Sequence, residues 1–102
     1  MSSLRGLYGN DDYRRILIDQ KQLCYDNLER MRWILDDLKA EIASKYEELN
    51  SMKGYDPATK QARASLFEEI QQLKSDKKNL LESIQEVRDE LQDVKDELAG
   101  MS

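Results

Sequence analysis

The side chains able to do chemistry are few in this chain, and they do not gather into a reactive site of a known kind. Histidine is absent, and cysteine occurs once, as Cys24. The lack of histidine removes the commonest acid–base catalyst and the commonest metal ligand, and one cysteine cannot build a zinc site of the usual type. The four glycines are scattered, so no phosphate-binding loop is present. We therefore predict no catalytic residue, metal site, cofactor or small-molecule substrate, and we do not expect an enzyme.

The remaining reactive groups have ordinary structural explanations. Acidic pairs such as Asp36-Asp37 and Glu47-Glu48 are neighbours on a predicted helix, and successive helical residues point about 100° apart, so these carboxylates are expected to face water separately. Cys24 falls within an apolar repeat, where a cysteine acts as a small hydrophobic residue. A redox or cross-linking role is the alternative, and no cationic cluster nearby would activate the thiol for it.

Composition and charge narrow the choice of partners. The formal net charge is −5, with 16 basic and 21 acidic residues, which argues against a nucleic-acid binder and against docking on anionic membranes. No apolar run is long enough to span a bilayer, and the first ten residues lack the apolar core of a signal peptide. We expect protein partners, no membrane insertion and a location in the cytoplasm, with the nucleus as the alternative.

The elements that must position these residues are two helices of similar length. Residues 1–10 contain two glycines and two serines and are interpreted as a flexible arm. A helix is predicted over 11–52, a turn over 53–57, a second helix over 57–99, and a tail over 100–102. The charged fraction of 36% is too high for a thick core, but a narrow buried stripe remains possible, as in coiled coils.

The turn carries a helix stop followed by a helix start. Gly54 suits the left-handed position after a helix end. Asp56 suits an N-cap, and Pro57 suits the first helical turn, where its missing N–H has no partner to lose.

Apolar residues alternate at spacings of three and four along both predicted helices, which is the heptad pattern of a coiled-coil seam. In a heptad labelled abcdefg, positions a and d face the partner helix. Three lysines, Lys21, Lys45 and Lys77, interrupt the series, which also includes Leu17, Cys24, Met31 and Met52. The main seam positions are Leu28, Leu35, Leu38, Ile42, Leu49, Leu66, Ile70, Leu73, Leu80, Ile84, Val87, Leu91, Val94 and Leu98.

Two architectures fit this seam: an antiparallel hairpin within one chain, and a parallel dimeric coiled coil interrupted near residues 53–57. A parallel dimer would place each seam lysine beside its own copy. In a hairpin whose paired residue numbers sum to about 115, each seam lysine instead meets an apolar residue. We therefore predict an all-α fold with two long helices in an antiparallel coiled-coil hairpin, and we keep the parallel dimer as the alternative.

The flanks of the seam point less clearly to either architecture. In the hairpin Tyr46 would lie near Phe67, which is favourable. Like charges would also approach one another, as with Glu48 and Glu69. Such exposed pairs change stability by only about 0–1 kcal/mol each. Tyr25 near Arg88 would also be favourable, whereas Glu41 with Asp76 and Lys39 with Lys74 would be further like-charge pairs.

Six residues outside the seam are candidates for contact with a partner or with a second copy. Trp33 occupies position f, opposite the seam, beside Arg30 and Arg32, and tryptophan is enriched at interface hot spots; packing against its own helix is the alternative. The e positions are unusually apolar for a coiled coil, where charge is normal. They either widen the intramolecular seam or form a second interface, and they are Ile18, Tyr25, Tyr46, Phe67 and Leu81.

These features favour a non-enzymatic coiled-coil segment for oligomerisation or scaffolding, mediating protein–protein interaction within a larger cytoskeletal, trafficking or centrosomal protein. A homodimer is the expected state, because a lone hairpin would leave the apolar e flank partly wet. The alternative is a helical-hairpin binding module for a globular partner such as a small GTPase.

Overall fold

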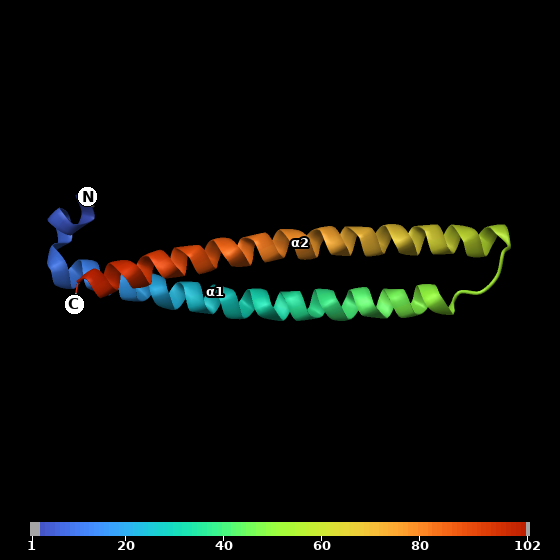
Figure 1. The fold of residues 1–102 in the computed structure, drawn as a ribbon, viewed down its shortest axis with the longest axis horizontal. Helices are drawn as coiled ribbons and strands as arrows, with labels where there is room; N and C mark the ends of the chain where they lie inside the picture. The colour runs from blue at the N-terminus through green and yellow to red at the C-terminus, as the bar shows by residue number, and fades with distance from the viewer. Residues whose placement is uncertain (1–2, 102) are drawn as a thin grey trace. The chain divides into compact units, whose positions relative to one another are not determined.

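A computed structural model describes the backbone of residues 3–101 and the side chains of residues 11–101, and it contains two helices. Helix α1 runs from Ser3 to Ser51 and α2 from Pro57 to Gly100, and they fold back on each other as a hairpin (Figure 1). This confirms the predicted all-α antiparallel hairpin, so the parallel dimer is wrong. The first helix was expected to start near Asp11, and this residue lies inside α1, which begins at Ser3. The predicted arm, 1–10, stays a prediction, because residues 1 and 2 and all its side chains lie outside the described residues.

The hairpin divides into two compact units, which are described separately. Unit 1 comprises residues 1–30 and 83–102, and unit 2 comprises residues 31–82. Each unit pairs a segment of α1 with a segment of α2 running in the opposite direction (Figure 1).

Asp56 starts α2 as predicted. Its carboxylate accepts hydrogen bonds from the Thr59 backbone N–H at 3.3 Å and from the Thr59 hydroxyl at 2.6 Å. These bonds satisfy donors that the first helical turn otherwise leaves unpaired, and Pro57 follows at the first helical position. The pKa of Asp56 is lowered, first by the hydroxyl bond from Thr59 and then by the backbone bond, because both favour the ionised form.

The end of α1 differs from the prediction. The helix ends at Ser51, so Gly54 lies further into the loop than the position expected of it. Gly54 still adopts a positive φ of 143°, which residues with a side chain rarely adopt. The Arg63 guanidinium, from α2, donates a hydrogen bond to the Met52 carbonyl. A cation on carbonyls at a helix end is favourable, so α2 supplies the cap that glycine was expected to provide.

In unit 2 the seam is closed most tightly near the start of α2. Ile70 is completely buried at 0% exposure, and Leu66 is buried at 5%. The seam lysines Lys45 and Lys77 are half-buried, as their long apolar stems allow. The other seam residues of the unit are half-buried: Met31, Leu35, Leu38, Ile42, Leu49, Met52, Leu73 and Leu80.

In unit 1 the buried positions follow the same period. Tyr13, Leu17 and Val94 form a core cluster, with Leu98 and Met101 packed against it. Leu98 thus packs against the cluster that contains Leu17, which is compatible with the expected register, in which paired numbers sum to about 115. The Tyr13 hydroxyl donates to the Glu97 carboxylate, which joins the two helices beside the seam. The remaining seam residues are buried or half-buried: Lys21, Cys24, Leu28, Ile84, Val87 and Leu91.

The outer faces of the helices are held by local polar bonds. Four glutamine side chains each donate to the aspartate one turn ahead, at 2.9–3.0 Å. Such pairs contribute about 0.2–0.5 kcal/mol each to a helix. They are Gln22–Asp26, Gln72–Asp76, Gln85–Asp89 and Gln92–Asp96.

Candidate interaction surfaces

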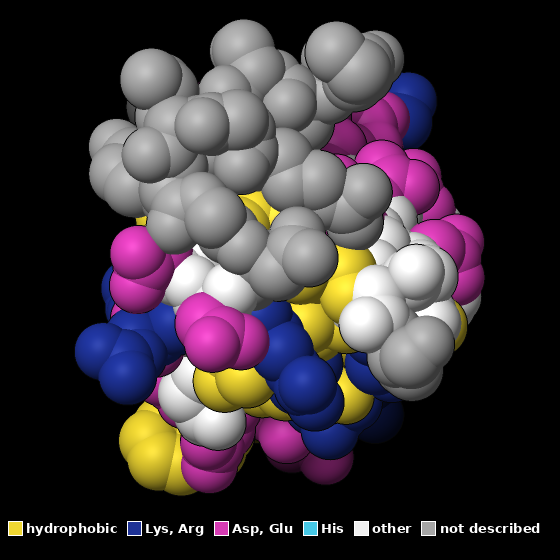
Figure 2. Space-filling view, turned by 90° about the vertical axis from the view of Figure 1, so that its left-hand side faces the viewer, with side chains coloured by type: hydrophobic (Ala, Val, Ile, Leu, Met, Phe, Trp, Pro, Cys, Tyr) yellow, Lys and Arg dark blue, Asp and Glu magenta, His cyan; other side chains and the backbone are white. Residues whose placement is uncertain are grey.

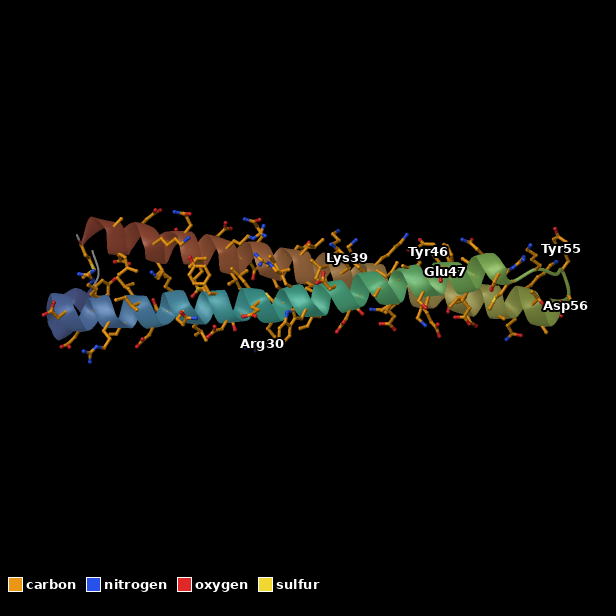
Figure 3. The ribbon with its side chains drawn as sticks, turned by 90° about the horizontal axis from the view of Figure 1, so that it is seen from below. Arg30, Lys39, Tyr46, Glu47, Tyr55 and Asp56 are labelled. Carbon is orange, nitrogen blue, oxygen red and sulfur yellow. The ribbon has the colours of Figure 1, made fainter. Side chains whose placement is uncertain are left out.

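In unit 2 the e positions of both helices meet on one side of the seam. The Lys74 ammonium lies 5.0 Å from the centre of the Tyr46 ring, within the range of a cation–π contact. Phe67, one heptad before Lys74, is 51% exposed, and Leu81, one heptad after it, is 44% exposed. Figure 3 shows Lys39 and Tyr46 along the same edge of α1. We call this surface the aromatic–basic flank; in unit 2 it consists of Arg32, Lys39, Tyr46, Phe67, Lys74 and Leu81.

Unit 1 repeats the arrangement. The Lys95 ammonium lies 5.4 Å from the centre of the Tyr25 ring. Ile18 is 44% exposed and Tyr25 is 42% exposed, and hydrophobic side chains come to the surface between charged ones in Figure 2. In unit 1 the aromatic–basic flank consists of Ile18, Tyr25, Arg88 and Lys95.

The tyrosines contact lysines one heptad beyond the neighbours expected from register alone, which were Arg88 for Tyr25 and Phe67 for Tyr46. Helical side chains lean towards the N-terminus of their own helix. In an antiparallel pair, a tyrosine on α1 therefore leans towards the C-terminal end of α2, while a lysine on α2 leans back to meet it. The offset is the same in both units, so it follows from helix geometry rather than from a local irregularity.

The opposite side of the seam carries the g positions and is acidic. Lys45 reaches out from a d position to the Glu69 carboxylate, with an Nζ–Oε2 distance of 3.1 Å. The pKa of Lys45 is raised, mainly by this hydrogen bond and further by the charges of Glu69, Glu41 and Glu48. The negative charges of three carboxylates therefore favour the protonated form of this ammonium. We call this surface of unit 2 the acidic flank; it consists of Glu41, Glu48, Glu69 and Asp76.

Trp33 faces away from the seam, in unit 2. Its side chain is 66% exposed, and the neighbouring Ile34 is 45% exposed. This exposure agrees with the expected f position, while packing of the covered part of Trp33 against its own helix stays the alternative. The indole is thus a second apolar surface, separate from the contacts that define the aromatic–basic flank.

Cys24 is buried within unit 1 at 3% exposure. Its pKa is raised, first by burial and then by the negative charge of Glu90. Both effects disfavour the reactive thiolate, so this environment suits a packing residue and opposes nucleophilic or redox chemistry.

A shallow pocket of about 440 Å³ lies in unit 2, where the loop meets the first turns of α2. Tyr55, in the same loop, is 85% exposed, and Figure 3 shows it with Asp56 at this turn. The pocket has a mixed lining with one cation and no carboxylate: Ser51, Met52, Lys53, Ala58, Thr59 and Ala62.

Within residues 11–101, no group of three or more Asp, Glu, Cys or His residues is placed to hold a metal ion. In the described part of the chain, neither helix has a stretch both long and apolar enough to cross a membrane.

Comparison with protein-family models, with curated proteins and with solved structures gave no match to this chain. Function is therefore inferred from the surfaces alone.

Two features that matter for these surfaces were not anticipated from the sequence. Tyr13, a g-position residue in unit 1, is among the most buried side chains at 4% exposure; its spacing of four from Leu17 was the available signal. Like-charge neighbours such as Glu48 and Glu69 indicated the acidic flank only in part, although the g positions show the same seven-residue period as the seam.

Proposed function

We propose that the chain is a non-enzymatic coiled-coil segment that self-associates and mediates protein–protein interaction, as a scaffold or oligomerisation element of a cytoskeletal, trafficking or centrosomal protein. The observation that supports this most directly is the exposure of Phe67 and Leu81 on the aromatic–basic flank, at 51% and 44%. Both sit at heptad positions that usually carry charge.

The apolar area left in water favours association. An aromatic side chain buries about 150–250 Å² when fully covered, so covering the exposed half of Phe67 removes roughly 100 Å² from water. At about 25 cal/mol per Å² this corresponds to roughly 2.5 kcal/mol before the entropy cost of association. Ile18, Tyr25 and Leu81 are exposed to similar fractions and add to this driving force.

Sedimentation equilibrium across a range of concentrations tests the proposal. The chain has a mass of 12.0 kDa, and we expect an average mass of at least twice that value at tens of micromolar in low salt. A mass that stays at the monomer value up to several hundred micromolar would refute self-association.

Binding of a globular partner is a second candidate, supported by the 66% exposure of Trp33. A tryptophan held on a rigid helix loses little entropy on binding, which favours it as an interface anchor. Trp33→Ala is expected to leave helicity and melting temperature almost unchanged while weakening partner binding by about 2 kcal/mol or more.

The indole emission of the chain alone provides the first check on this candidate. We expect emission typical of an indole in water and ready quenching by iodide. A blue-shifted and protected indole at concentrations where the chain self-associates would place Trp33 in the self-association interface and remove this second candidate.

A further inference from the structure

We infer that self-association occurs by docking the aromatic–basic flank of one copy against the acidic flank of a second copy. This inference rests on the proposed self-association and adds its geometry. The two surfaces are different, so the contact is heterologous. In a pair, one copy keeps its acidic flank free and the other keeps its aromatic–basic flank free.

The charges of unit 2 are sorted by flank. Its aromatic–basic flank carries three cations, Arg32, Lys39 and Lys74, and no acidic residue. Its other members are the apolar side chains of Tyr46, Phe67 and Leu81. Its acidic flank carries four carboxylates and no basic residue at the g positions. Although the net charge of the chain is −5, unit 2 therefore presents one cationic side and one strongly anionic side.

The acidic flank carries more carboxylates than its seam lysine can neutralise. Lys45 reaches Glu69 directly and is also influenced by the charges of Glu41 and Glu48. The single positive charge of Lys45 thus offsets only part of the negative charge of these three carboxylates, and the acidic flank keeps a net negative charge. Further cations brought to this side relieve the repulsion between like charges, which is the condition for a charge-complementary partner surface.

The aromatic–basic flank supplies cations together with apolar area. The Lys74 ammonium is held against the Tyr46 ring at 5.0 Å, and the exposed Phe67 ring lies one heptad away. Docking then removes apolar surface from water while the lysine and arginine head groups reach carboxylates at the rim. Apolar contact supplies affinity, and charge sets which surfaces meet.

Charge also decides between the possible self-contacts. Two copies joined through their aromatic–basic flanks would face Lys39 and Lys74 with the same cations of the second copy. Joining through two acidic flanks would crowd carboxylates in the same way. Only opposite flanks combine attraction with burial of Phe67. Because a heterologous contact leaves complementary flanks free, assembly continues past the dimer unless the copies close into a ring.

The experiment uses the full chain and two pairs of charge reversals. The first variant combines Lys39→Glu with Lys74→Glu, and the second combines Glu48→Lys with Asp76→Lys. A control variant, Glu68→Lys with Glu82→Lys, changes the net charge as the second does but alters f positions outside both flanks. Sedimentation velocity measures association at low salt and at about 1 M salt, where the screening length is about 3 Å.

We expect the unmodified chain and the control to grow beyond dimers with concentration at low salt, and high salt to weaken association. Each flank variant alone should associate at least tenfold more weakly. An equimolar mixture of the two flank variants should recover association, because one then carries carboxylates on both sides and the other carries cations on both sides.

Other outcomes separate this inference from the proposed function. If the second variant associates as tightly as the unmodified chain, the acidic flank is not in the interface and the inference is wrong, while self-association stands. A mixture that fails to recover association, with both variants helical by circular dichroism, also overturns it. An unmodified chain that is monomeric throughout refutes both. If a charge reversal unfolds the chain, a neutral variant replaces it: Lys39→Gln with Lys74→Gln for the first variant, and Glu48→Gln with Asp76→Asn for the second. Each neutral variant is expected to weaken association.

Discussion

Replacing Ile70 by alanine tests the packing of unit 2 most sharply. Ile70 is fully buried, at 0% exposure. Truncation removes three carbon atoms, and at about 0.8 kcal/mol each the lost transfer free energy is roughly 2.4 kcal/mol. A residual cavity adds to this, and measured losses for such changes span about 2–5 kcal/mol. Two helices can partly close the gap, so we expect a loss of about 2.5–3.5 kcal/mol in the free energy of unfolding, within that range.

The matched control is Ile34→Ala, the same chemical change in the same unit at a residue that is 45% exposed. Both substitutions gain the same intrinsic helix propensity, so the difference between them isolates burial. Urea unfolding followed by circular dichroism at one protein concentration measures both. For a domain of this size about 1 kcal/mol corresponds to roughly 4–8 °C, so Ile70→Ala should melt roughly 10–28 °C lower. Equal effects at the two positions would refute the heptad register.

Three further predictions follow from the loop and from the buried thiol. Asp56→Ala should lower the melting temperature at neutral pH. The pKa of Asp56 is lowered in the folded chain from an ordinary value near 3.8, so its contribution to stability is present above that value and is lost as pH falls through the folded pKa. Thermal melts in which the variant shows the same deficit in strong acid as at neutral pH would contradict this. Arg63→Ala removes the bond to the Met52 carbonyl and should cost roughly 1 kcal/mol in urea unfolding, whereas no change would mean that water replaces it fully. Cys24, whose pKa burial raises, should react with a disulfide reagent at pH 8 at least about tenfold more slowly in the folded chain than in urea; equal rates would show that it is accessible.

The helical hairpin was predictable because its main determinant is a repeat. Alternating spacings of three and four are a property of the sequence itself, and the pair Asp56-Pro57 marks a helix start through local chemistry that packing does not override. The seam lysines distinguished the hairpin from the parallel dimer because a charge opposite its own copy is unfavourable in any detailed packing.

The details that were not predicted depend on the length and direction of individual side chains rather than on the heptad period. Arg63 caps α1 from the other helix, a contact eleven residues away in sequence that no local motif encodes. The lysine partners of Tyr25 and Tyr46 follow from the direction in which helical side chains lean, which a straight pairing of numbers ignores. Exposure was better anticipated, since Trp33 at an f position must face away from the seam whatever its neighbours are.

The antiparallel pairing of α1 and α2 is the central claim, because it alone places e beside e and g beside g and so separates the two flanks. It is tested by the distance between spin labels at Gln22 and Gln92, both exposed residues of unit 1, in a Cys24→Ala background diluted with unlabelled chain. With an interaxial distance of 8–10 Å and helix radii of about 5–6 Å, the two positions should lie within about 25 Å. In a continuous helix the same residues would be about 105 Å apart at 1.5 Å per residue. A short distance is the result we predict, and a long one would contradict the hairpin and both flanks with it.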